Sequence, residues 1–280
     1  MKTIAITGSS GFVGQNLKKF FEDKKCEVIS IKREYLKDDN KLLDIVSKSD
    51  VIINLAGANI INRWTESYKE LLYSSRIETT KAIVKAINSS EKKPDILIST
   101  SAIGVYDNKS TYDESASLNN DFLANLGKDW EEEAKKAQIP VAIFRFGIVL
   151  GKNGGALDKM LLPFKLGVGG VIGSGNQAFS FIHIEDLLNA YEHVIENKLE
   201  GTFNLVSPTP TTNKGLTKAL GKYLHRPTIF PVPEFMLKLI FSEGAKILTD
   251  GQSVVPQKLL DNGFNFKYKN IEQAIEDLVT

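Results

Sequence analysis

Short β-branched runs alternate along this chain with longer amphipathic stretches, and few folds accommodate that alternation. The runs lie at Thr3–Thr7, Val28–Ile31, Val51–Leu55, Ile96–Thr100, Val141–Phe146 and Thr202–Leu205. The stretches between them place apolar residues three and four positions apart, as helices on a sheet do, at Gln15–Lys24, Tyr68–Asn88, Asn125–Ala137 and Glu185–Asn197. Strands that alternate with helices form parallel sheets through crossover connections. The sequence therefore predicts an α/β fold with a doubly wound parallel sheet, and a mixed α+β fold is the alternative.

The residue composition of the chain changes after Ser207. The segment Ser207-Pro208-Thr209-Pro210 is rich in turn formers, and six of the nine prolines lie after Ser207. At roughly 150 residues per domain, a chain of 280 residues suits either two domains or one large domain with an appendage. We predict a main domain over residues 1–207 and a smaller C-terminal lobe over residues 208–280.

Charge and hydropathy exclude two classes of partner. The 35 basic side chains oppose 34 acidic ones, so the formal net charge is +1. Nucleic acids and anionic membrane surfaces need a concentrated excess of Lys and Arg, and no basic stripe is present. No run approaches the roughly 20 apolar residues of a membrane span, and the first residues lack the pattern of a secretory signal. We expect a cytoplasmic protein that binds neither nucleic acid nor membrane.

The metal-binding and redox-active residue types are sparse. Cys26 is the single cysteine, so it cannot form an internal disulfide, and we interpret it as a reduced, packed thiol. The three histidines are scattered and give no metal-ligand spacing. We therefore predict no metal site.

A glycine-rich turn directly follows the first predicted strand and opens the first predicted helix. Glycines at Gly8, Gly11 and Gly14 would let a pyrophosphate approach the free N–H groups and the positive dipole end of that helix. Glycines are also common in ordinary turns, so the position after a strand and before a helix carries more weight than the pattern. We predict that this turn binds a dinucleotide through Gly8, Ser10, Gly11, Phe12, Val13 and Gly14.

The second strand ends in residues that bear on the choice of coenzyme. An acidic side chain at this place would accept hydrogen bonds from the adenosine ribose of NAD, but the strand ends Ser30-Ile31-Lys32-Arg33. A guanidinium can form paired hydrogen bonds with a 2′-phosphate, so Arg33 favours NADP(H). Glu34 keeps NAD as the less favoured option, and a solvated strand end is the alternative without function.

The third apolar run closes on small residues in the segment Asn54-Leu55-Ala56-Gly57. Alone, such a run indicates only a buried strand. Together with the glycine turn, it fits the fourth strand of a Rossmann sheet, whose carboxyl end borders the ligand crevice. We predict that Leu55, Ala56 and Gly57 contact the coenzyme.

At these residues the chain resembles the extended or atypical short-chain dehydrogenases/reductases, and within them the YfcH-type epimerase-family proteins, which carry their own C-terminal domain. The motifs cover nearly the whole chain. They are Gly8 to Gly14, Asn54 to Gly57, Arg63-Trp64-Thr65 with Ser75-Arg76-Ile77, Ser99-Thr100-Ser101 with Val105-Tyr106, Lys128-Asp129-Trp130-Glu131, Arg145 to Gly151, Gly169-Gly170, Gly173 to Gln177, Ser180 to His183, His225-Arg226-Pro227 and Phe230 to Pro233. The resemblance implies a Rossmann domain that holds NADP(H), with Thr100 among the coenzyme contacts, and a substrate lobe to which residues 151–182 also contribute.

The superfamily implied by this resemblance transfers protons with a tyrosine and a lysine four residues later on one helix face. None of the eight tyrosines here is followed by lysine at that spacing. Lys128 fits the lysine position and is expected to hold the nicotinamide ribose, but Ala124 stands where the tyrosine belongs. An alanine methyl group cannot transfer a proton.

Two hydroxyl groups are candidates for the missing chemistry. Ser101 matches the superfamily position that hydrogen-bonds a substrate oxygen, and Tyr106 follows in a loop from which it could reach in as a substitute acid. Serines at strand ends and tyrosines at loop bases are also common structural residues. We predict Ser101, Tyr106 and Lys128 as the catalytic set.

Other side chains allow two interpretations each. His183 precedes a predicted helix, where it could cap a turn or line the cleft, and Glu131-Glu132-Glu133 is expected to be a solvated helix face. Trp64, with Arg63 and Arg76 near it in the sequence, could close over substrate or simply fill a packing gap.

Two functions follow from these residues. The first is an NADP(H)-dependent, epimerase-like oxidoreductase acting on a small polar substrate of the sugar- or nucleotide-linked kind. The second is a catalytically inactive protein that binds or senses NADP(H), because the proton-donating tyrosine is absent. A homodimer is the default expectation for its assembly.

Overall fold

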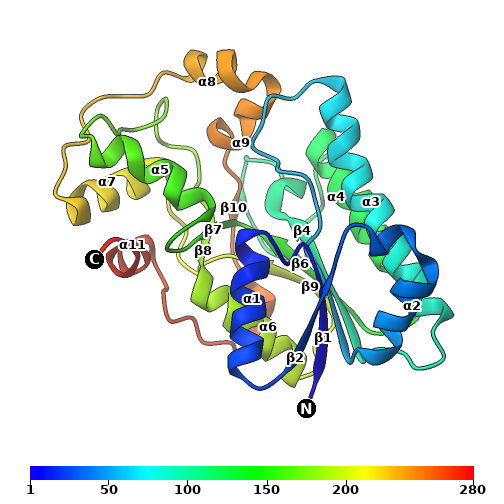
Figure 1. The fold of residues 1–280 in the computed structure, drawn as a ribbon. Coiled ribbons are helices and arrows are strands. Elements are labelled where there is room, and N and C mark those ends of the chain that lie inside the picture. The colour runs from blue at the N-terminus through cyan, green and yellow to red at the C-terminus, as the bar shows by residue number, and fades with distance from the viewer.

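The computed structural model describes residues 1–280 and has at its centre a six-stranded parallel sheet (Figure 1). Its strands lie in the order β2-β1-β3-β4-β6-β9. Their bounds are β1 Thr3–Thr7, β2 Glu27–Ile31, β3 Val51–Asn54, β4 Ile96–Ala102, β6 Val141–Phe146 and β9 Gly201–Leu205. The doubly wound parallel α/β sheet predicted from the alternation is therefore confirmed.

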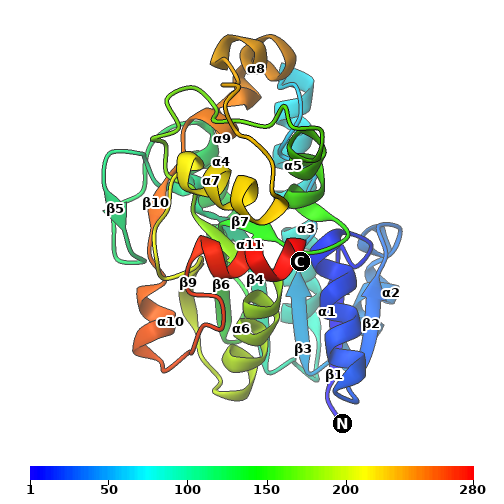
Figure 2. The ribbon, with the colours of Figure 1, turned by 90° about the vertical axis from the view of Figure 1, so that its left-hand side faces the viewer.

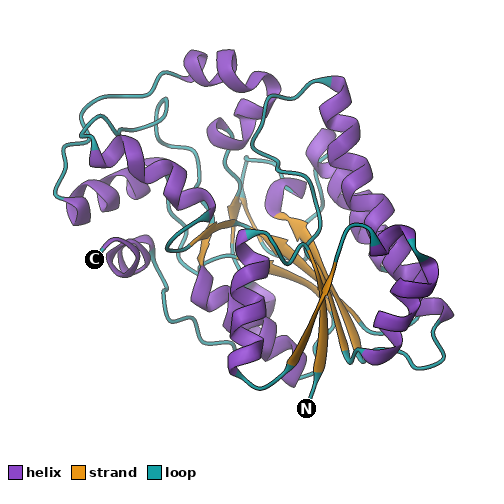
Figure 3. Cartoon of the chain, viewed as in Figure 1, coloured by secondary structure: helices purple, strands orange, loops and turns teal.

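Helices cover both faces of this sheet, as Figures 1 and 3 show. One face carries α1 (Phe12–Asp23) and α6 (Ile184–Glu196), and the other carries α2 (Asp39–Lys48), α3 (Glu66–Ser89) and α4 (Phe122–Ala134). Alternate strand residues enter separate cores: Ile4 and Ile6 pack under α1 and α6, whereas Ala5 packs under α2 and α3. Because both faces are covered, β3 is buried at every position, which explains its unbroken apolar sequence.

The run at residues 51–55, predicted to be the fourth strand of a Rossmann sheet, is β3, the third strand along the chain. It pairs with β1 on the side opposite β2, which is the place of that fourth strand in the sheet order. Only the short helix η1 (Tyr35–Lys37) and α2 lie between β2 and β3, so one strand of the complete fold is missing there. The sheet order still reverses between β1 and β3, and ligands of open α/β sheets bind at such a reversal.

A second group of helices lies at one side of the sheet (Figures 1 and 2). Its apolar cluster unites α5 (Gly155–Lys165), α7 (Asn213–Leu224) and α11 (Ile271–Val279), so it draws on residues 151–182 as well as on the tail. The tail also returns to the main sheet, because Leu259, Phe264 and Phe266 belong to the core under α1 and α6. The two predicted segments are thus interleaved in their packing.

Short elements complete the chain. They are η2 (Ile103–Val105), β5 (Thr111–Tyr112), β7 (Ile148–Leu150), β8 (Phe181–His183), α8 (Glu234–Phe241), η3 (Ser242–Ala245), α9 (Lys246–Thr249), β10 (Ser253–Val254) and α10 (Gln257–Asp261). β10 pairs with β5, and β7 pairs with β8. None of the helices combines the length and apolar character that crossing a membrane requires.

Candidate functional site

The turn between β1 and α1 packs so tightly that backbone atoms are in contact with backbone atoms. Gly8 has φ +67°, a left-handed conformation that favours glycine, and a Cβ there would lie 3.0 Å from the Leu55 carbonyl oxygen. A Cβ on Gly14 would lie 2.3 Å from the Gly8 carbonyl oxygen. The turn therefore admits no side chain at either position, because its backbone packs directly on the end of β3 and on the start of α1.

The first turn of α1 is left open. Side chains cap the N-termini of α2, α3, α4, α6, α7 and α11, whereas Gly11 at the start of α1 provides no side-chain cap. No acidic residue lies in this first turn. The free N–H groups and the positive end of the helix dipole are then available to an anion, so these residues fit a dinucleotide pyrophosphate.

The end of β3 is fixed against this turn by buried hydrogen bonds. The backbone N–H groups of Leu55 and Ala56 donate to the Thr7 hydroxyl at 3.1 and 3.2 Å. That hydroxyl donates to Asn54 Oδ1 at 2.7 Å, and Asn54 Nδ2 donates to the Thr80 hydroxyl at 2.8 Å. Of the predicted coenzyme contacts, the structure thus places Leu55 against Gly8, and Ala56 is bonded to the neighbouring Thr7.

Phe12 connects the turn with the predicted substrate segment. Its ring packs on the chain at Gly151, Gly154 and Gly155, where a Cβ would meet ring atoms at 2.6 to 2.9 Å. Gly154 is the N-cap residue of α5 and provides no side-chain cap. Val13 points the other way and packs against the apolar core under α1. Residues 151–155 therefore border the coenzyme turn directly.

Arg33 lies free at the end of β2. Its side chain is exposed, whereas neighbouring Lys32 is 4.0 Å from Glu34. Ser10 is also exposed, and its carbonyl accepts a hydrogen bond from Gln15 at 2.9 Å. An exposed guanidinium at this strand end is available to a phosphate from solvent.

The two predicted catalytic hydroxyls lie in a buried polar network. The Ser101 hydroxyl donates to Glu131 Oε1 at 2.7 Å, and the Tyr106 hydroxyl donates to Asn204 Oδ1 at 3.0 Å. Both residues are 1% exposed. Each hydroxyl is therefore turned away from solvent and already bonded, and the catalytic roles of Ser101 and Tyr106 stay predictions.

A buried ion pair joins these two hydroxyls. Arg145 donates from Nε and Nη2 to the two Glu131 carboxylate oxygens, both at 2.7 Å, and from Nη1 to the Tyr106 hydroxyl at 2.7 Å. Glu131 is 2% exposed, so the expectation that it belongs to a solvated helix face is wrong. Burial alone would lower the pKa of Arg145, but the hydrogen bonds and the charge of Glu131 outweigh burial and raise this pKa. The ion pair with Arg145 therefore holds Glu131 inside the protein. Burial raises the pKa of Tyr106.

Helix α4 carries the positions of the superfamily dyad. Ala124 is fully buried, and its N–H donates to the capping Asp121 carboxylate at 2.9 Å. Lys128, one helical turn later, is half-buried. Thr100, at the end of β4, has a buried hydroxyl without a hydrogen-bond partner. The lysine position is filled and the tyrosine position contains only a methyl group.

Trp64 and Arg63 anchor a loop to the tail. Trp64 is 6% exposed, packs against Phe122 at a ring distance of 5.5 Å, and donates from its indole to the Ile60 carbonyl at 3.0 Å. Arg63 donates to the Leu239 carbonyl of α8 at 2.9 Å. Trp64 therefore fills a packing gap, which is one of the two roles expected for it; the other was closure over substrate.

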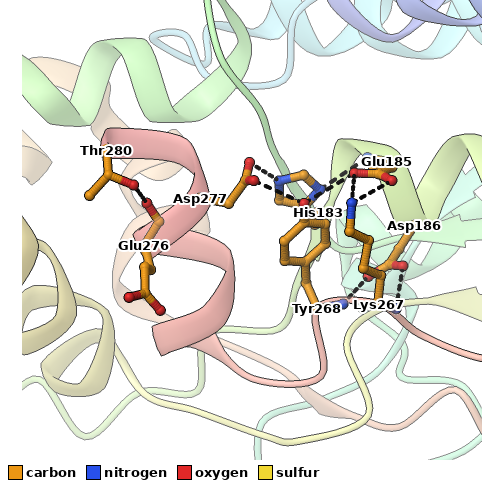
Figure 4. Close-up of polar contacts among 8 residues, drawn as sticks. All are labelled: His183, Glu185, Asp186, Lys267, Tyr268, Glu276, Asp277 and Thr280. Atoms are coloured by element: carbon orange, nitrogen blue, oxygen red, sulfur yellow. Dashed lines mark hydrogen bonds and ion pairs between the residues drawn. The ribbon is translucent and has the colours of Figure 1, made fainter.

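His183 caps α6 and contacts the C-terminal helix, as Figure 4 shows. Its Nδ1 accepts from the Glu185 N–H at 3.1 Å, and its Nε2 lies 3.4 Å from Asp277 Oδ2 of α11. The ring stacks on Tyr268 with centroids 3.7 Å apart. Burial lowers the pKa of His183 from 6.5 to about 4, which outweighs the nearby carboxylates. The neutral imidazole is thus a structural cap that ties the tail to the main domain.

This depressed pKa predicts acid sensitivity. Between pH 6.5 and about 4 the unfolded chain binds a proton at His183 that the folded protein does not, so folding loses at most about 3 kcal/mol over this interval. His183→Asn retains a capping acceptor and removes the titration. We expect the stability advantage of wild type over this variant, measured by urea unfolding, to shrink as pH falls from about 7 to 4.5. An advantage that does not change with pH would contradict the assignment.

A polar hollow of about 420 Å³ lies beside the second helix group. Residues 108–111, 176–178 and 210–212 line it together with Gly251 and Ser253. It includes part of the segment predicted to serve the substrate cleft, but none of the predicted coenzyme or catalytic residues. Elsewhere, no three His, Cys, Asp or Glu side chains are gathered in a way that could hold a metal ion.

Sequence reasoning missed Glu131, Arg145 and the hydrogen-bonding role of Thr80. One signal was available for the ion pair: Arg145 interrupts the apolar strand sequence Val-Ala-Ile-Phe-Arg-Phe, and a charge in a buried strand needs a partner. Glu131 lies three residues before the buried Ala134 and four after the buried Gly127, so helical periodicity also places it on the inner face of α4. Thr80 shows no comparable signal.

The parallel sheet, the glycine turn at its order reversal and the lysine on α4 define a Rossmann protein of the short-chain dehydrogenase/reductase type. Comparison with protein families extends this result. Residues 4–205 match the NAD dependent epimerase/dehydratase family, and residues 232–278 match a domain of unknown function, DUF1731. The chain belongs to the NAD dependent epimerase/dehydratase family.

Individual relatives span the same length. The chain is 35% identical to the chloroplastic epimerase family protein SDR39U1 homolog of Arabidopsis thaliana, over 99% of this chain and 86% of that protein. It is 34% identical to the epimerase family protein YfhF of Bacillus subtilis, over 99% and 97%. The crystal structure of human epimerase family protein SDR39U1 with NADPH superposes with a TM-score of 0.89 at 31% identity, covering 99% of each chain. The family resemblance inferred from the motifs is confirmed.

Proposed function

We propose that this protein binds NADP(H) across the N-terminus of α1 and acts as an epimerase-like oxidoreductase on a small polar substrate. The observation that carries the proposal is the uncapped, glycine-lined start of α1, which lies at the reversal of the sheet order. The human relative whose structure contains NADPH supports the choice of coenzyme.

In this proposal different residues of the chain bind different parts of the coenzyme. The backbone from Gly8 to Gly14 binds the pyrophosphate, Arg33 binds the 2′-phosphate, and Lys128 holds the nicotinamide ribose. When bound, NADPH supplies a hydride. The hydrogen bonds from Leu55 and Ala56 to Thr7 keep the β3 end rigid, so the coenzyme meets a preformed surface.

The source of the proton is the distinctive part of the proposal. Ala124 has no proton to give, and the Ser101 and Tyr106 hydroxyls serve Glu131 and Asn204. A catalytic role for either hydroxyl therefore requires the Glu131–Arg145 network to open around substrate. Without that opening, the network only positions β4 and η2. The proton required by the reaction then comes from water or from a group of the substrate itself.

A second candidate function is an NADP(H)-binding protein without turnover. It is favoured by the same observations, because a missing tyrosine and two sequestered hydroxyls leave no side chain ready for acid–base catalysis. Such a protein would signal coenzyme occupancy to a partner through the C-terminal lobe.

One experiment separates the two functions: NADPH absorbance is followed with a broad panel of carbonyl compounds. The enzyme hypothesis predicts that at least one compound oxidises NADPH and that Lys128→Ala slows this reaction about 100-fold. Lys135→Ala, an exposed lysine at the end of the same helix, is the matched control. If NADPH binds, no compound is reduced and Lys128→Ala alters affinity alone, the binding protein is the correct function.

Arg33→Ala tests the coenzyme preference. Loss of a charge-assisted phosphate contact is expected to cost about 1.5 to 3 kcal/mol of NADPH binding and to leave NADH binding nearly unchanged. Calorimetric titration of both coenzymes measures the effect. Lys19→Ala removes the same charge from an exposed site on α1 and should change neither affinity. Equal losses for NADPH and NADH would refute the role of Arg33.

A further inference from the structure

Arg76 on α3 holds its guanidinium inside the protein without an acidic partner. The residue is half-buried, and its Nη1 and Nη2 donate to the carbonyl oxygens of Leu72 and Ala58, both at 3.0 Å. No carboxylate pairs with it, and burial lowers the pKa of Arg76 to about 10. Arginines removed from water are normally paired, because desolvating a charge is costly unless an opposite charge compensates it. The protein itself therefore supplies no anion to compensate the charge of Arg76.

The guanidinium is held in place from two sides. Its Cζ lies 5.2 Å from the centre of the Trp130 ring, in cation–π contact. The guanidinium also contacts Gly57, where a Cβ would lie 3.0 Å from Cζ. The Thr80 hydroxyl donates to the Arg76 carbonyl at 2.8 Å and accepts from the Trp130 indole at 2.9 Å. This rigidity reduces the entropy that a ligand contact would otherwise cost.

The position of Arg76 relates it to the coenzyme turn. Gly57 follows β3, and Leu55 of the same segment lies against Gly8. Trp130 belongs to α4. Arg76 therefore lies beside the segment that follows β3 and packs against the turn expected to bind pyrophosphate.

The remaining capacity of the side chain fits an oxyanion. A guanidinium has five N–H bonds in a planar fork, and two of the Arg76 bonds are used by carbonyl groups. We propose that Arg76 is an anion-recognition residue, which binds a phosphate or carboxylate oxygen at the carboxyl edge of β3. The anion is either a phosphate of the coenzyme or an acidic group of the substrate. The first source rests on the proposed function, whereas the second makes the substrate an anion.

Arg76→Gln and Arg76→Lys test this proposal, with Lys81→Gln as a control that removes a charge from an exposed position on the same helix. NADPH and NADH affinities are measured by calorimetry, and inorganic phosphate is titrated into free and NADPH-saturated protein. If the coenzyme supplies the anion, Arg76→Gln weakens NADPH and NADH equally, by about 10-fold or more, unlike Arg33→Ala. If the substrate supplies it, coenzyme affinity is unchanged and phosphate binding to the saturated protein falls by about 10-fold or more.

The lysine variant separates recognition from bracing. Lysine keeps the charge and loses the fork, so an anion site retains part of its affinity in Arg76→Lys and less in Arg76→Gln. A residue that only braces the loop at Ala58 would lower the melting temperature equally in both variants. The proposal is wrong if coenzyme affinities match the control and phosphate binds no more tightly to wild type than to Arg76→Gln. If wild type binds neither coenzyme, the proposed function fails, and phosphate titration of the free protein still tests Arg76.

Discussion

Replacing Gly14 with alanine is expected to weaken NADPH binding by about 100-fold or more. The new Cβ would lie 2.3 Å from the Gly8 carbonyl oxygen and 2.7 Å from the Ser9 Cα, and both are backbone atoms that no side-chain rotation can move. Helix α1 must then shift away from the turn, which separates the N–H groups that together bind the pyrophosphate. Isothermal titration calorimetry measures the loss.

The matched control for this variant is Gly104→Ala. There the new Cβ would meet Leu123 at 3.6 Å, an ordinary van der Waals contact, so NADPH affinity should remain within about twofold of wild type. Circular dichroism melting establishes that both variants are folded. A folded Gly14→Ala protein with wild-type affinity would show that the turn does not bind the coenzyme.

Replacing Arg145 with methionine is expected to destabilise the fold by about 3 to 5 kcal/mol. The change leaves the Glu131 carboxylate buried at 2% exposure without its cation, and it removes the donor to the Tyr106 hydroxyl. Arg226→Met, at an exposed position, should change stability by no more than about 0.5 kcal/mol. The free energy of unfolding in urea measures both.

The double variant Glu131→Leu with Arg145→Met tests the cause. If the loss arises from an uncompensated buried charge, removing the second charge should restore more than half of it. A double variant as unstable as the sum of the two single variants would contradict this explanation. So would a loss below about 1 kcal/mol in Arg145→Met alone.

The sheet could be predicted because buried parallel strands have distinctive sequences. β1 has the predicted bounds, Thr3–Thr7, and β9 begins one residue before the predicted Thr202. Such strands are apolar on both faces and are separated by amphipathic helices, so local sequence is sufficient to find them. All six strands of the central sheet lie at predicted apolar runs. The short pairs β5–β10 and β7–β8 were not predicted, because strands of two or three residues show no local periodicity.

The surroundings of the site depended on contacts between distant segments. The glycine turn is local, and its role follows from its position after β1. The environment of Arg76 is not local, since it combines the Ala58 carbonyl, Gly57 and the Trp130 ring from different parts of the chain. Likewise, Tyr106 bonds to Asn204 of β9, which is 98 residues away along the chain. Periodicity finds elements, but the partner of a buried polar group is set by tertiary packing.

Coenzyme binding at the glycine turn is tested most directly by calorimetric titration of NADPH into the wild-type protein and into Gly14→Ala under identical conditions. We expect one NADPH bound per wild-type chain, more tightly than NADH, and little or no binding to the folded variant. Absence of heat with wild type at saturating NADPH, or equal binding by the two proteins, would contradict this expectation.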